Sequence, residues 1–341
     1  MNFSRLKKLE FHDHLDGSLR PLTVWEEAQK NGVNIACLTG ETHPTPESTE
    51  KWLKSAAASR NLNSFLEKFA LTTAVLQTEE SLFRAARETV HDWHAVNTVY
   101  GETRFAPENH TAGGLSEERA VEAVAAGLKA GSAETGVRTG LILCAMRQNC
   151  RSRKTAELCL KRQDLVCGFD LAGPERGFPV TLHEEAFRLL REAGFRGITC
   201  HAGEDANEEA VSLAVEAGAL RVGHAAVFAD QPLRKRLRER LIECCLTSNE
   251  ATRAVSDIRC HPVKTFFADG IPFLLCCDDR LMCNTDLNRE YARAADAFGW
   301  DESVFIEMNR RAVDFAFGLT DDEKTRLKAE IGESVPSDTN L

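Results

Sequence analysis

Eight short apolar segments recur along the 341 residues, separated by longer segments with helical periodicity, and this alternation constrains the fold more than any other feature. Strands that alternate with helices pair in parallel through right-handed crossovers, and eight such units can close into a barrel. A chain of this length would otherwise divide into two domains. The sequence therefore predicts an α/β fold of the (β/α)8 TIM-barrel type, with residues 1–341 as one barrel domain. The expected strands are Leu9–Leu15, Thr98–Ala106, Gly140–Met146, Leu165–Leu171, Gly197–Ala202, Leu220–Ala225, Leu241–Leu246 and Pro272–Cys277.

The first crossover is much longer than one helix requires. It contains helical patterns at Leu22–Asn31, Glu47–Ala58 and Leu62–Thr73. An insertion after a barrel strand lies at the C-terminal end of the barrel, where active sites are built. We therefore expect residues 16–80 to form a helical cap inserted after the first strand. The alternative, a separate N-terminal domain, would separate the first expected strand from its sheet.

Two of the later helices carry recognisable end signals. Thr181 and Glu184 have the spacing of a capping box, and Gly194 stands where a left-handed residue would end the same helix. Another helix is expected to begin near Asn207 and to stop at Gly218.

Composition and charge exclude several classes of protein. The chain has 42 Lys and Arg against 52 Asp and Glu, a net charge of −10, which disfavours nucleic acid as a partner. No segment approaches the roughly 18 consecutive apolar residues of a membrane span, and residues 1–8 lack the apolar core of a secretory signal. We expect no membrane partner and a cytoplasmic location. The 12 cysteines include no C-x-x-C pair and are expected to be reduced thiols, mostly buried in strands. No feature predicts the oligomeric state.

Polar side chains stand at the ends of several expected strands, where a parallel barrel builds its active site. His12 and His14 are two residues apart in the first strand, so both imidazoles point to the same face. His201 ends the fifth strand, His224 ends the sixth, and Asp278 follows the eighth. An H-x-H pair alone is weak evidence for a metal site, and Asp278 alone could be a helix N-cap. Their recurrence at strand ends favours a shared site at one mouth of the barrel.

The side chains in this set indicate which metal they would bind. Imidazole and carboxylate without thiolate favour Zn²⁺, with other divalent transition metals possible. Adjacent carboxylates at Asp278 and Asp279 are costly to bury unless a cation or a substrate compensates them. An open metal position would carry water and lower its pKa toward about 7, which predicts a hydrolase. The fourth strand end, Phe169–Pro174, offers no lysine to bridge two metals, so we expect one ion per chain.

Short motifs follow most of the expected strands. They are His12-Asp-His14-Leu-Asp16-Gly17-Ser18, Glu102-Thr-Arg104-Phe105-Ala106-Pro107 with His110, Asp170-Leu-Ala-Gly173, His201-Ala-Gly-Glu204, Gly223-His224, Thr247-Ser248-Asn249, His261-Pro262 and Asp278-Asp279. In these motifs the chain resembles the adenosine deaminase family of metal-dependent aminohydrolases, over nearly its full length. The resemblance implies a (β/α)8 barrel that hydrolyses adenosine or 2′-deoxyadenosine to inosine and ammonia with a zinc-activated water.

The resemblance also implies roles for individual residues. One Zn²⁺ would be held by His12, His14, His201 and Asp278. The catalytic residues would be Glu204, which protonates purine N1, His224, which assists the water, and Asp279, which hydrogen-bonds purine N7. The substrate would also meet His14, the ribose-binding Asp16 at the 5′-hydroxyl, and the amide of Gly173 at N3. A carboxyl that protonates N1 needs a raised pKa, which we expect for Glu204.

The sequence departs from the family pattern near the seventh and eighth strands. Cys277 and Arg280 flank the aspartate pair, where many members have threonine and proline, and Leu246 stands where a proline often follows a cysteine. None of these changes touches an expected ligand, so we expect them to affect substrate fit rather than chemistry.

Several alternatives share the same residues. Adenine deaminases resemble this pattern but usually place glutamate where Asp16 stands, and the shorter carboxylate leaves room for a ribose. A small-molecule purine nucleoside is therefore the expected partner. Deaminases of 5′-modified adenosines, such as methylthioadenosine or aminodeoxyfutalosine, remain open because the cap shapes the 5′ pocket. A catalytically silent nucleoside-binding protein is a more distant alternative.

Overall fold

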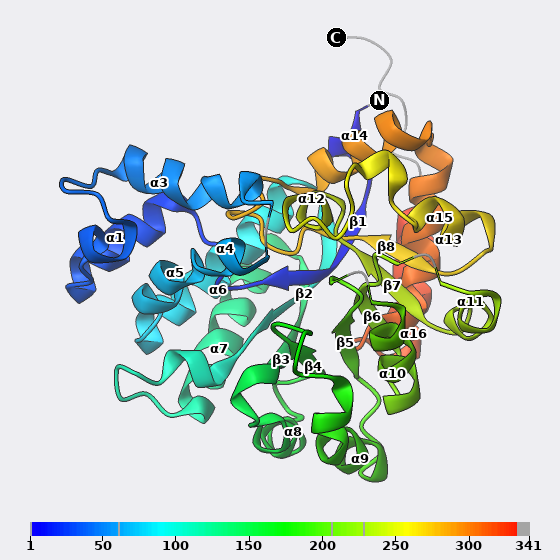
Figure 1. The fold of residues 1–341 in the computed structure, drawn as a ribbon, viewed down its shortest axis with the longest axis horizontal. Helices are drawn as coiled ribbons and strands as arrows, with labels where there is room; N and C mark the ends of the chain where they lie inside the picture. Colours follow the sequence, from blue (N-terminus) through cyan, green and yellow to red (C-terminus); the bar gives the residue numbers. More distant parts are fainter. Residues whose placement is uncertain (1, 61, 206, 228, 333–341) are drawn as a thin grey trace.

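The strands form a closed barrel at the centre of the molecule (Figure 1). The computed structural model describes residues 2–60, 62–205, 207–227 and 229–332, and eight strands lie within these ranges. All of them pair in parallel, in two four-stranded sheets of order β1-β2-β3-β4 and β5-β6-β7-β8. The strands are β1 (Lys8–His14), β2 (Thr98–Phe105), β3 (Arg138–Met146), β4 (Gly168–Ala172), β5 (Thr199–Ala202), β6 (Arg221–His224), β7 (Leu241–Cys244) and β8 (Phe273–Leu275).

Two short seams join the sheets into the barrel. Between β4 and β5, the N–H of Phe169 donates to the carbonyl of Gly197 over 2.7 Å. Between β8 and β1, the N–H of Asp278 donates to the carbonyl of His12 over 2.7 Å, and the N–H of His14 donates to the carbonyl of Asp278 over 2.8 Å. The predicted fold class is confirmed, and every strand overlaps one of the expected segments.

Helices connect the strands and surround the barrel, as expected when right-handed crossovers link parallel strands (Figure 1). None of the helices in the described residues is long and apolar enough to cross a membrane. The helices that follow the inserted segment are α6 (Glu79–Ala95), α7 (Glu117–Thr135), α8 (Ser152–Lys161), α9 (Glu184–Glu192), α10 (Glu208–Ala217), α11 (Gln231–Leu237), α12 (Leu246–Ala251), α13 (Val263–Ala268), α14 (Leu287–Phe298), α15 (Glu302–Ala312) and α16 (Asp321–Gly332).

Short helices fill the segment between β1 and α6, and α1 and α3 project to one side of the barrel (Figure 1). The expected helical patterns in this insertion are confirmed, and α2 is an addition that the sequence analysis did not predict. Asn34 caps α2 by accepting from the N–H of Cys37, and Gly40 ends it in the left-handed conformation, at φ 74°. The helices are α1 (Pro21–Asn31), α2 (Ile35–Thr39), α3 (Pro46–Lys54), α4 (Leu62–Leu66) and α5 (Phe69–Val75).

The end signals of α9 and α10 had different outcomes. The capping box at Thr181 and Glu184 is wrong, because Val180–His183 forms a 3-10 turn and α9 begins at Glu184 without a side-chain cap. Gly194 does adopt the left-handed conformation after α9, at φ 73°. Gly218 ends α10 in the same conformation, and Asn207 caps its start, as predicted.

The strand cysteines are packed into the core as free thiols. Six of the seven that were assigned to strands are buried, and Cys167 is half-buried. Burial raises the pKa of the Cys244 and Cys276 thiols well above the usual range, which keeps them protonated and unreactive. This supports the prediction of reduced, structural cysteines.

Candidate active site

Four side chains converge at the C-terminal mouth of the barrel. His12 and His14 come from β1, His201 from β5, and Asp278 from the residue run after β8. The Nε2 atoms of His12 and His14 each lie 3.1 Å from Nε2 of His201. Oδ1 of Asp278 lies 3.0 Å from Nε2 of His12 and 3.3 Å from Nε2 of His14. The potential ligand atoms of all four residues lie within 4.8 Å of one another.

The outer nitrogens of two of these rings show how the site is protonated. Nδ1 of His12 lies 2.8 Å from a carboxylate oxygen of Glu243, and Nδ1 of His201 lies 3.0 Å from Asp170. An ionised carboxylate can only accept, so both Nδ1 atoms carry the proton. The Nε2 lone pairs of His12 and His201 then face each other over 3.1 Å, an arrangement that a cation stabilises. Zinc–nitrogen bonds of about 2.0–2.1 Å would separate tetrahedral ligands by about 3.3 Å, so the cluster fits such an ion.

A buried ionic network holds these carboxylates in place beneath the cluster. Arg104 donates to Asp170 over 3.0 Å and to Glu243 over 2.8 Å, and Arg221 lies 2.8 Å from the second oxygen of Glu243. Burial disfavours the charged form of Glu243, but Arg104 and Arg221 hold its pKa well below the usual range. The carboxylate of Glu243 therefore stays ionised and keeps the proton of His12 on Nδ1, which leaves Nε2 free to bind a metal.

A cavity of about 240 Å³ opens directly above the cluster. Its wall includes both aspartates of the pair and residues from strands on opposite sides of the barrel. His12 lies behind this wall and is fully buried. The structure thus brings together all the residues that the sequence analysis assigned to the site. Those that line the cavity are His14, Asp16, Gly173, His201, Glu204, His224, Asp278 and Asp279.

Glu204 is held by a second carboxylate that accepts hydrogen bonds from its turn. Glu175 accepts from the N–H groups of Gly203 over 3.0 Å, of Glu204 over 2.7 Å and of Asp205 over 3.4 Å. Burial raises the pKa of Glu204 well above its usual range, and the charges of Asp278 and Glu175 add to this shift. Glu204 is therefore suited to donate a proton at neutral pH, as expected.

Asp279 lines the cavity and has one carboxyl oxygen without a hydrogen-bond partner among the described residues. This oxygen, Oδ1, is buried. Burial raises the pKa of Asp279 well above its usual range, and Asp278 and Asp16 add to the shift. A carboxyl kept neutral in this way can donate a hydrogen bond to a ligand. A Cβ on Gly17 would lie 1.7 Å from Oδ1 of Asp279, so only glycine at position 17 permits this placement.

Backbone geometry at three cavity residues departs from the strand conformation. His224 and Asp278 have φ values of 66° and 65°, in the left-handed region that residues other than glycine seldom adopt. Gly173 has φ 95°, and a Cβ there would lie 2.6 Å from Oε1 of Gln148. These turns redirect the chain as each strand ends, which aims functional groups into the mouth rather than along the barrel.

Asp16 lines the cavity, and His110 lies behind it as a fully buried residue that is not part of the cavity lining. Oδ2 of Asp16 lies 3.9 Å from Nε2 of His110, and this nitrogen is buried without a hydrogen-bond partner. Nδ1 of His110 bonds to the carbonyl of Leu76 over 2.9 Å, so this nitrogen carries the proton of the neutral ring. Burial lowers the pKa of His110, which favours that neutral form. Asp16 is the member of this pair that can accept from a hydroxyl group in the cavity.

The inserted helices supply the apolar part of the cavity wall. Their side chains face the polar residues of the strand ends, so a bound molecule would meet a polar floor and an apolar side. Part of the insertion therefore borders the cavity, and a cap formed by residues 16–80 stays a prediction. The residues concerned are Leu62, Phe65, Leu66, Phe69 and Thr73.

The departures near the eighth strand do not reach the cavity. Arg280 donates to Asp13 over 2.9 Å and to Asp92 over 2.9 Å, which ties the barrel seam to α6. Cys277 is buried, and its N–H donates to Glu10 over 3.1 Å. Neither Arg280 nor Cys277 lines the cavity, so the expected effect on substrate fit is not supported by a contact.

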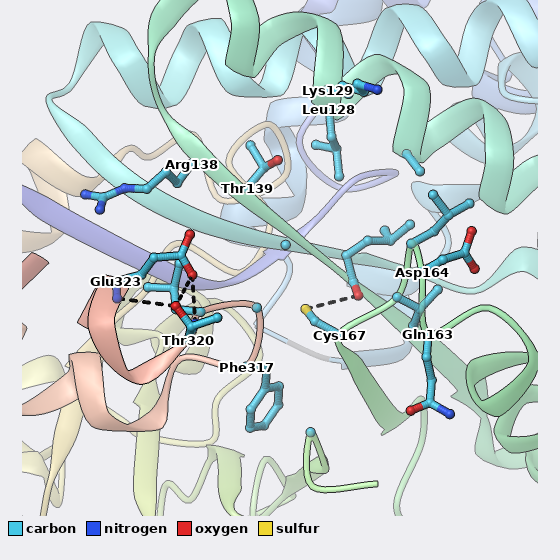
Figure 2. Close-up of a pocket in the computed structure, with 18 of the residues that line it drawn as sticks. Leu128, Lys129, Arg138, Thr139, Gln163, Asp164, Cys167, Phe317, Thr320 and Glu323 are labelled. Carbon is cyan, nitrogen blue, oxygen red and sulfur yellow. Dashed lines mark hydrogen bonds between the residues drawn. The ribbon is translucent and has the colours of Figure 1, made fainter. Parts of the chain in front are cut away.

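A larger cavity, of about 790 Å³, lies at the opposite end of the barrel (Figure 2). It is lined by the start of β3 and the residues before β4 and β5. Arg138 at its edge is paired with Glu330 over 2.8 Å, and Thr320 bonds to Glu323, which caps the start of α16 (Figure 2). Arg138, Thr320 and Glu323 thus have structural partners, whereas polar groups that converge without such partners lie in the smaller cavity. The smaller cavity is the candidate active site.

Several supporting residues were missed by the sequence analysis. Glu243 appeared only as one letter within an expected strand, and Glu175 lay outside every motif given a role. A lone carboxylate in an otherwise apolar strand is an available signal, because burying it requires a compensating partner. Here the partners are Arg104, Arg221 and His12.

Comparisons with known proteins identify the family of the chain. A family model described as adenosine deaminase matches residues 7–334. An adenosine deaminase from Mycolicibacterium vanbaalenii is 36% identical over 353 aligned residues, which cover 97% of this chain and 95% of the relative. The solved structure of an Arabidopsis N6-mAMP deaminase is 27% identical, with a TM-score of 0.84 over 96% of this chain and 98% of that chain. An adenine deaminase from Arthrobacter aurescens shares the fold, with 23% identity and a TM-score of 0.85 over 96% and 98% of the two chains. The chain belongs to the adenosine deaminase family.

Proposed function

We propose that this protein hydrolyses adenosine and 2′-deoxyadenosine to inosine and ammonia, using one Zn²⁺ per chain. The observation that carries the proposal is the convergence of three imidazole nitrogens and Asp278 beside Glu204, an acid whose side chain is only 10% exposed and lines the same cavity. The family membership and the similarity to relatives named adenosine deaminase support the reaction class.

The metal would be held by His12, His14, His201 and Asp278. When bound, zinc supplies Lewis acidity that makes water a usable nucleophile near neutral pH. His224 and Cys245 also lie near Asp278 in a second possible ligand group. Burial raises the pKa of the Cys245 thiol well above its usual range, and this supports the first group as the site.

The cavity offers hydrogen-bond donors that match a purine ring. Purine N1, N3 and N7 are all acceptors. Protonated Glu204 would donate to N1, the amide of Gly173 to N3, and protonated Asp279 to N7. The raised pKa values of both carboxyl groups support this assignment. A ring held at three nitrogens is fixed in position relative to the attacking water.

The proton transfers follow from the placement of Glu204. The oxygen of water adds to C6 while Glu204 donates its proton to N1, and the resulting carboxylate takes a proton from the water. Glu204 then returns that proton to the C6 amino group. The bond between C6 and the amine breaks, ammonia leaves, and the hydroxyl proton restores the protonated acid. Donation to N1 at the moment of addition prevents negative charge from building up in the ring.

Asp16 supports a nucleoside rather than a free base. Its carboxylate would accept the ribose 5′-hydroxyl, and His110 lies 3.9 Å behind it. A carboxylate at this place in the cavity wall would repel a 5′-phosphate. Adenine and 5′-modified adenosines are the remaining candidate substrates. An apolar 5′ substituent would find the apolar wall that the insertion contributes to the same cavity.

A substrate panel tests the proposal. Zinc-loaded protein would be assayed for ammonia release with adenosine, 2′-deoxyadenosine, adenine, methylthioadenosine and AMP. We expect kcat/KM to be highest for the two nucleosides and lower by at least about 100-fold for AMP. Asp16→Asn is the matched variant and should reduce that discrimination. Turnover of adenine without adenosine would overturn the substrate assignment, and inactivity on the whole panel would overturn the enzyme assignment.

A further inference from the structure

A buried row of three polar side chains leads from the cavity into the barrel wall. Nδ1 of His224 lies 3.0 Å from Nδ2 of Asn249. Oδ1 of Asn249 lies 3.1 Å from Nε2 of His261, whose Nδ1 accepts from the backbone N–H of Val263 over 3.0 Å. His224 and His261 are 1% exposed and Asn249 is fully buried, so water does not compete for these bonds.

The backbone N–H at the end of this row sets the direction of every bond in it. An amide N–H can only donate, so Nδ1 of His261 is the unprotonated nitrogen and Nε2 of the neutral ring carries the proton. That proton is donated to Oδ1 of Asn249, which turns the amide nitrogen toward His224. Nδ2 of Asn249 can only donate, so Nδ1 of His224 must accept. The proton of a neutral His224 is therefore on Nε2.

We propose that Asn249 and His261 are positioning residues, which hold His224 in the tautomer that presents an N–H donor to the cavity. The inference rests on the proposed deaminase reaction, because it assigns a state to a group that faces the reacting atoms. Burial lowers the pKa of His261 to about 3, which agrees with a neutral ring at the end of the row.

This tautomer changes what His224 can contribute. Its Nε2 lies 3.8 Å from Oε2 of Glu204, on the cavity side of the ring. With Nε2 already protonated, His224 would donate a hydrogen bond to the oxygen that attacks C6. Taking a further proton would create a buried imidazolium, which is costly without a paired anion. Glu204 is then the group that accepts the proton of the water, and His224 orients the oxygen.

Nuclear magnetic resonance of the zinc-loaded protein tests the tautomer directly. Histidine would be labelled with ¹⁵N, and the signals of His224 would be identified by their loss in His224→Gln. We expect Nδ1 of His224 to show the shift of an unprotonated nitrogen and Nε2 the shift of a protonated one. The reverse pattern, or two protonated nitrogens, would overturn the proposal. This measurement gives an answer even if no purine is turned over, so it is independent of the proposed function.

Asn249→Asp tests whether the tautomer affects turnover. A carboxylate of nearly the same shape accepts from both neighbours, so the proton of His224 should move to Nδ1. We expect kcat to fall by about 100-fold, with zinc content and KM little changed. Wild-type kcat in a variant whose ¹⁵N pattern has reversed would show that the tautomer does not serve the reaction.

A matched pair at position 261 separates positioning from packing. The amide of His261→Gln can still donate to Asn249, whereas His261→Leu fills similar space without a donor. We expect His261→Gln to keep kcat within about threefold of the wild type and His261→Leu to lose at least about tenfold. Equal losses in the two variants would mean that His261 serves only packing and would overturn its proposed role.

Discussion

The backbone N–H of Asp278 donates to the carbonyl of His12 over 2.7 Å, so the hydrogen bond that closes the barrel also joins two proposed metal ligands. The reciprocal bond, from the N–H of His14 to the carbonyl of Asp278, adds a third ligand to the same seam. The segment after β8 must therefore pair with β1 before three of the four proposed ligands can meet. Barrel closure and assembly of the metal site are one structural event.

This coupling predicts that zinc stabilises the folded chain. A ligand that binds only the folded state at 100 times its Kd adds about 2.7 kcal/mol to the free energy of unfolding. Zinc removal by a chelator should lower the Tm, and added zinc should restore it, as measured by thermal unfolding. His201→Ala is the control, because it removes one ligand from β5 and leaves the seam intact. A Tm that does not respond to zinc in the wild type would contradict the proposed site.

Gly17→Ala should weaken substrate binding without altering the metal site. The new Cβ would lie 1.7 Å from Oδ1 of Asp279, so this carboxyl must move away from its place in the cavity wall. Loss of one hydrogen bond to the substrate, at about 2 kcal/mol, corresponds to a roughly thirtyfold fall in kcat/KM. Gly332→Ala is a suitable control, since its Cβ would meet Arg310 only at 3.8 Å. Unchanged kcat/KM in Gly17→Ala would mean that Asp279 does not contact the substrate.

Glu175→Gln should shift the pH profile of the reaction. Glu175 accepts from the turn that carries Glu204, and its charge contributes to the raised pKa of Glu204. Activity needs protonated Glu204 and falls as pH rises through its pKa. Removing the charge at position 175 lowers that pKa, so the alkaline limb of kcat/KM should move to lower pH. Glu185→Gln, at an exposed side chain, should leave the limb in place. An alkaline limb that stays fixed in Glu175→Gln would show that Glu204 does not determine it.

Much of this architecture could be predicted because the chemistry of a barrel mouth is local in sequence. Each strand end is a short motif, and His12, His201 and Asp278 can be recognised as polar residues at the ends of apolar segments. The fold class follows from the alternation of strands and helices. These two regularities were enough to predict that His12, His14, His201, His224 and Asp278 meet at one mouth of the barrel, whereas Asp16 and Gly173 were assigned through the family resemblance.

The supporting interactions could not be predicted, because they join positions far apart in the chain. The bond between Glu243 and His12 spans 231 residues, and the one from Arg104 to Glu243 spans 139. Arg280 looked relevant to substrate fit because it follows the aspartate pair, but its side chain points to Asp13 and Asp92. The direction of a side chain after a turn depends on the backbone φ, which a sequence motif does not state.

The stability of the protein should depend on pH through His261. The pKa of His261 is lowered to about 3 in the folded protein, below the value of about 6.5 in an unfolded chain. The unfolded state thus binds one more proton as pH falls below 6.5, and stability is lost through the window from 6.5 toward 3. At pH 5 this histidine costs roughly 2 kcal/mol compared with pH 7.5.

His261→Gln removes this titration while retaining a donor. Urea unfolding at pH 5 and pH 7.5 should show a smaller difference in the variant than in the wild type, by roughly 2 kcal/mol. The other buried histidines contribute equally to both proteins, so they cancel. The same pH dependence in both proteins would indicate that His261 is already protonated at pH 5 in the folded state.

The proposed mechanism depends on Glu204, which would supply the proton for a hydrolysis that takes place beside the proposed zinc site. The direct test compares zinc-loaded wild type with Glu204→Gln, measuring ammonia released from adenosine and zinc bound per chain in the same samples. Glutamine keeps the shape of the side chain but cannot donate and recover the proton. We expect the wild type to convert adenosine to inosine and Glu204→Gln to lose at least about 1,000-fold in kcat. Both proteins should bind close to one zinc per chain. Turnover by Glu204→Gln near the wild-type rate, or a wild type that binds zinc and leaves adenosine unchanged, would contradict the proposed mechanism.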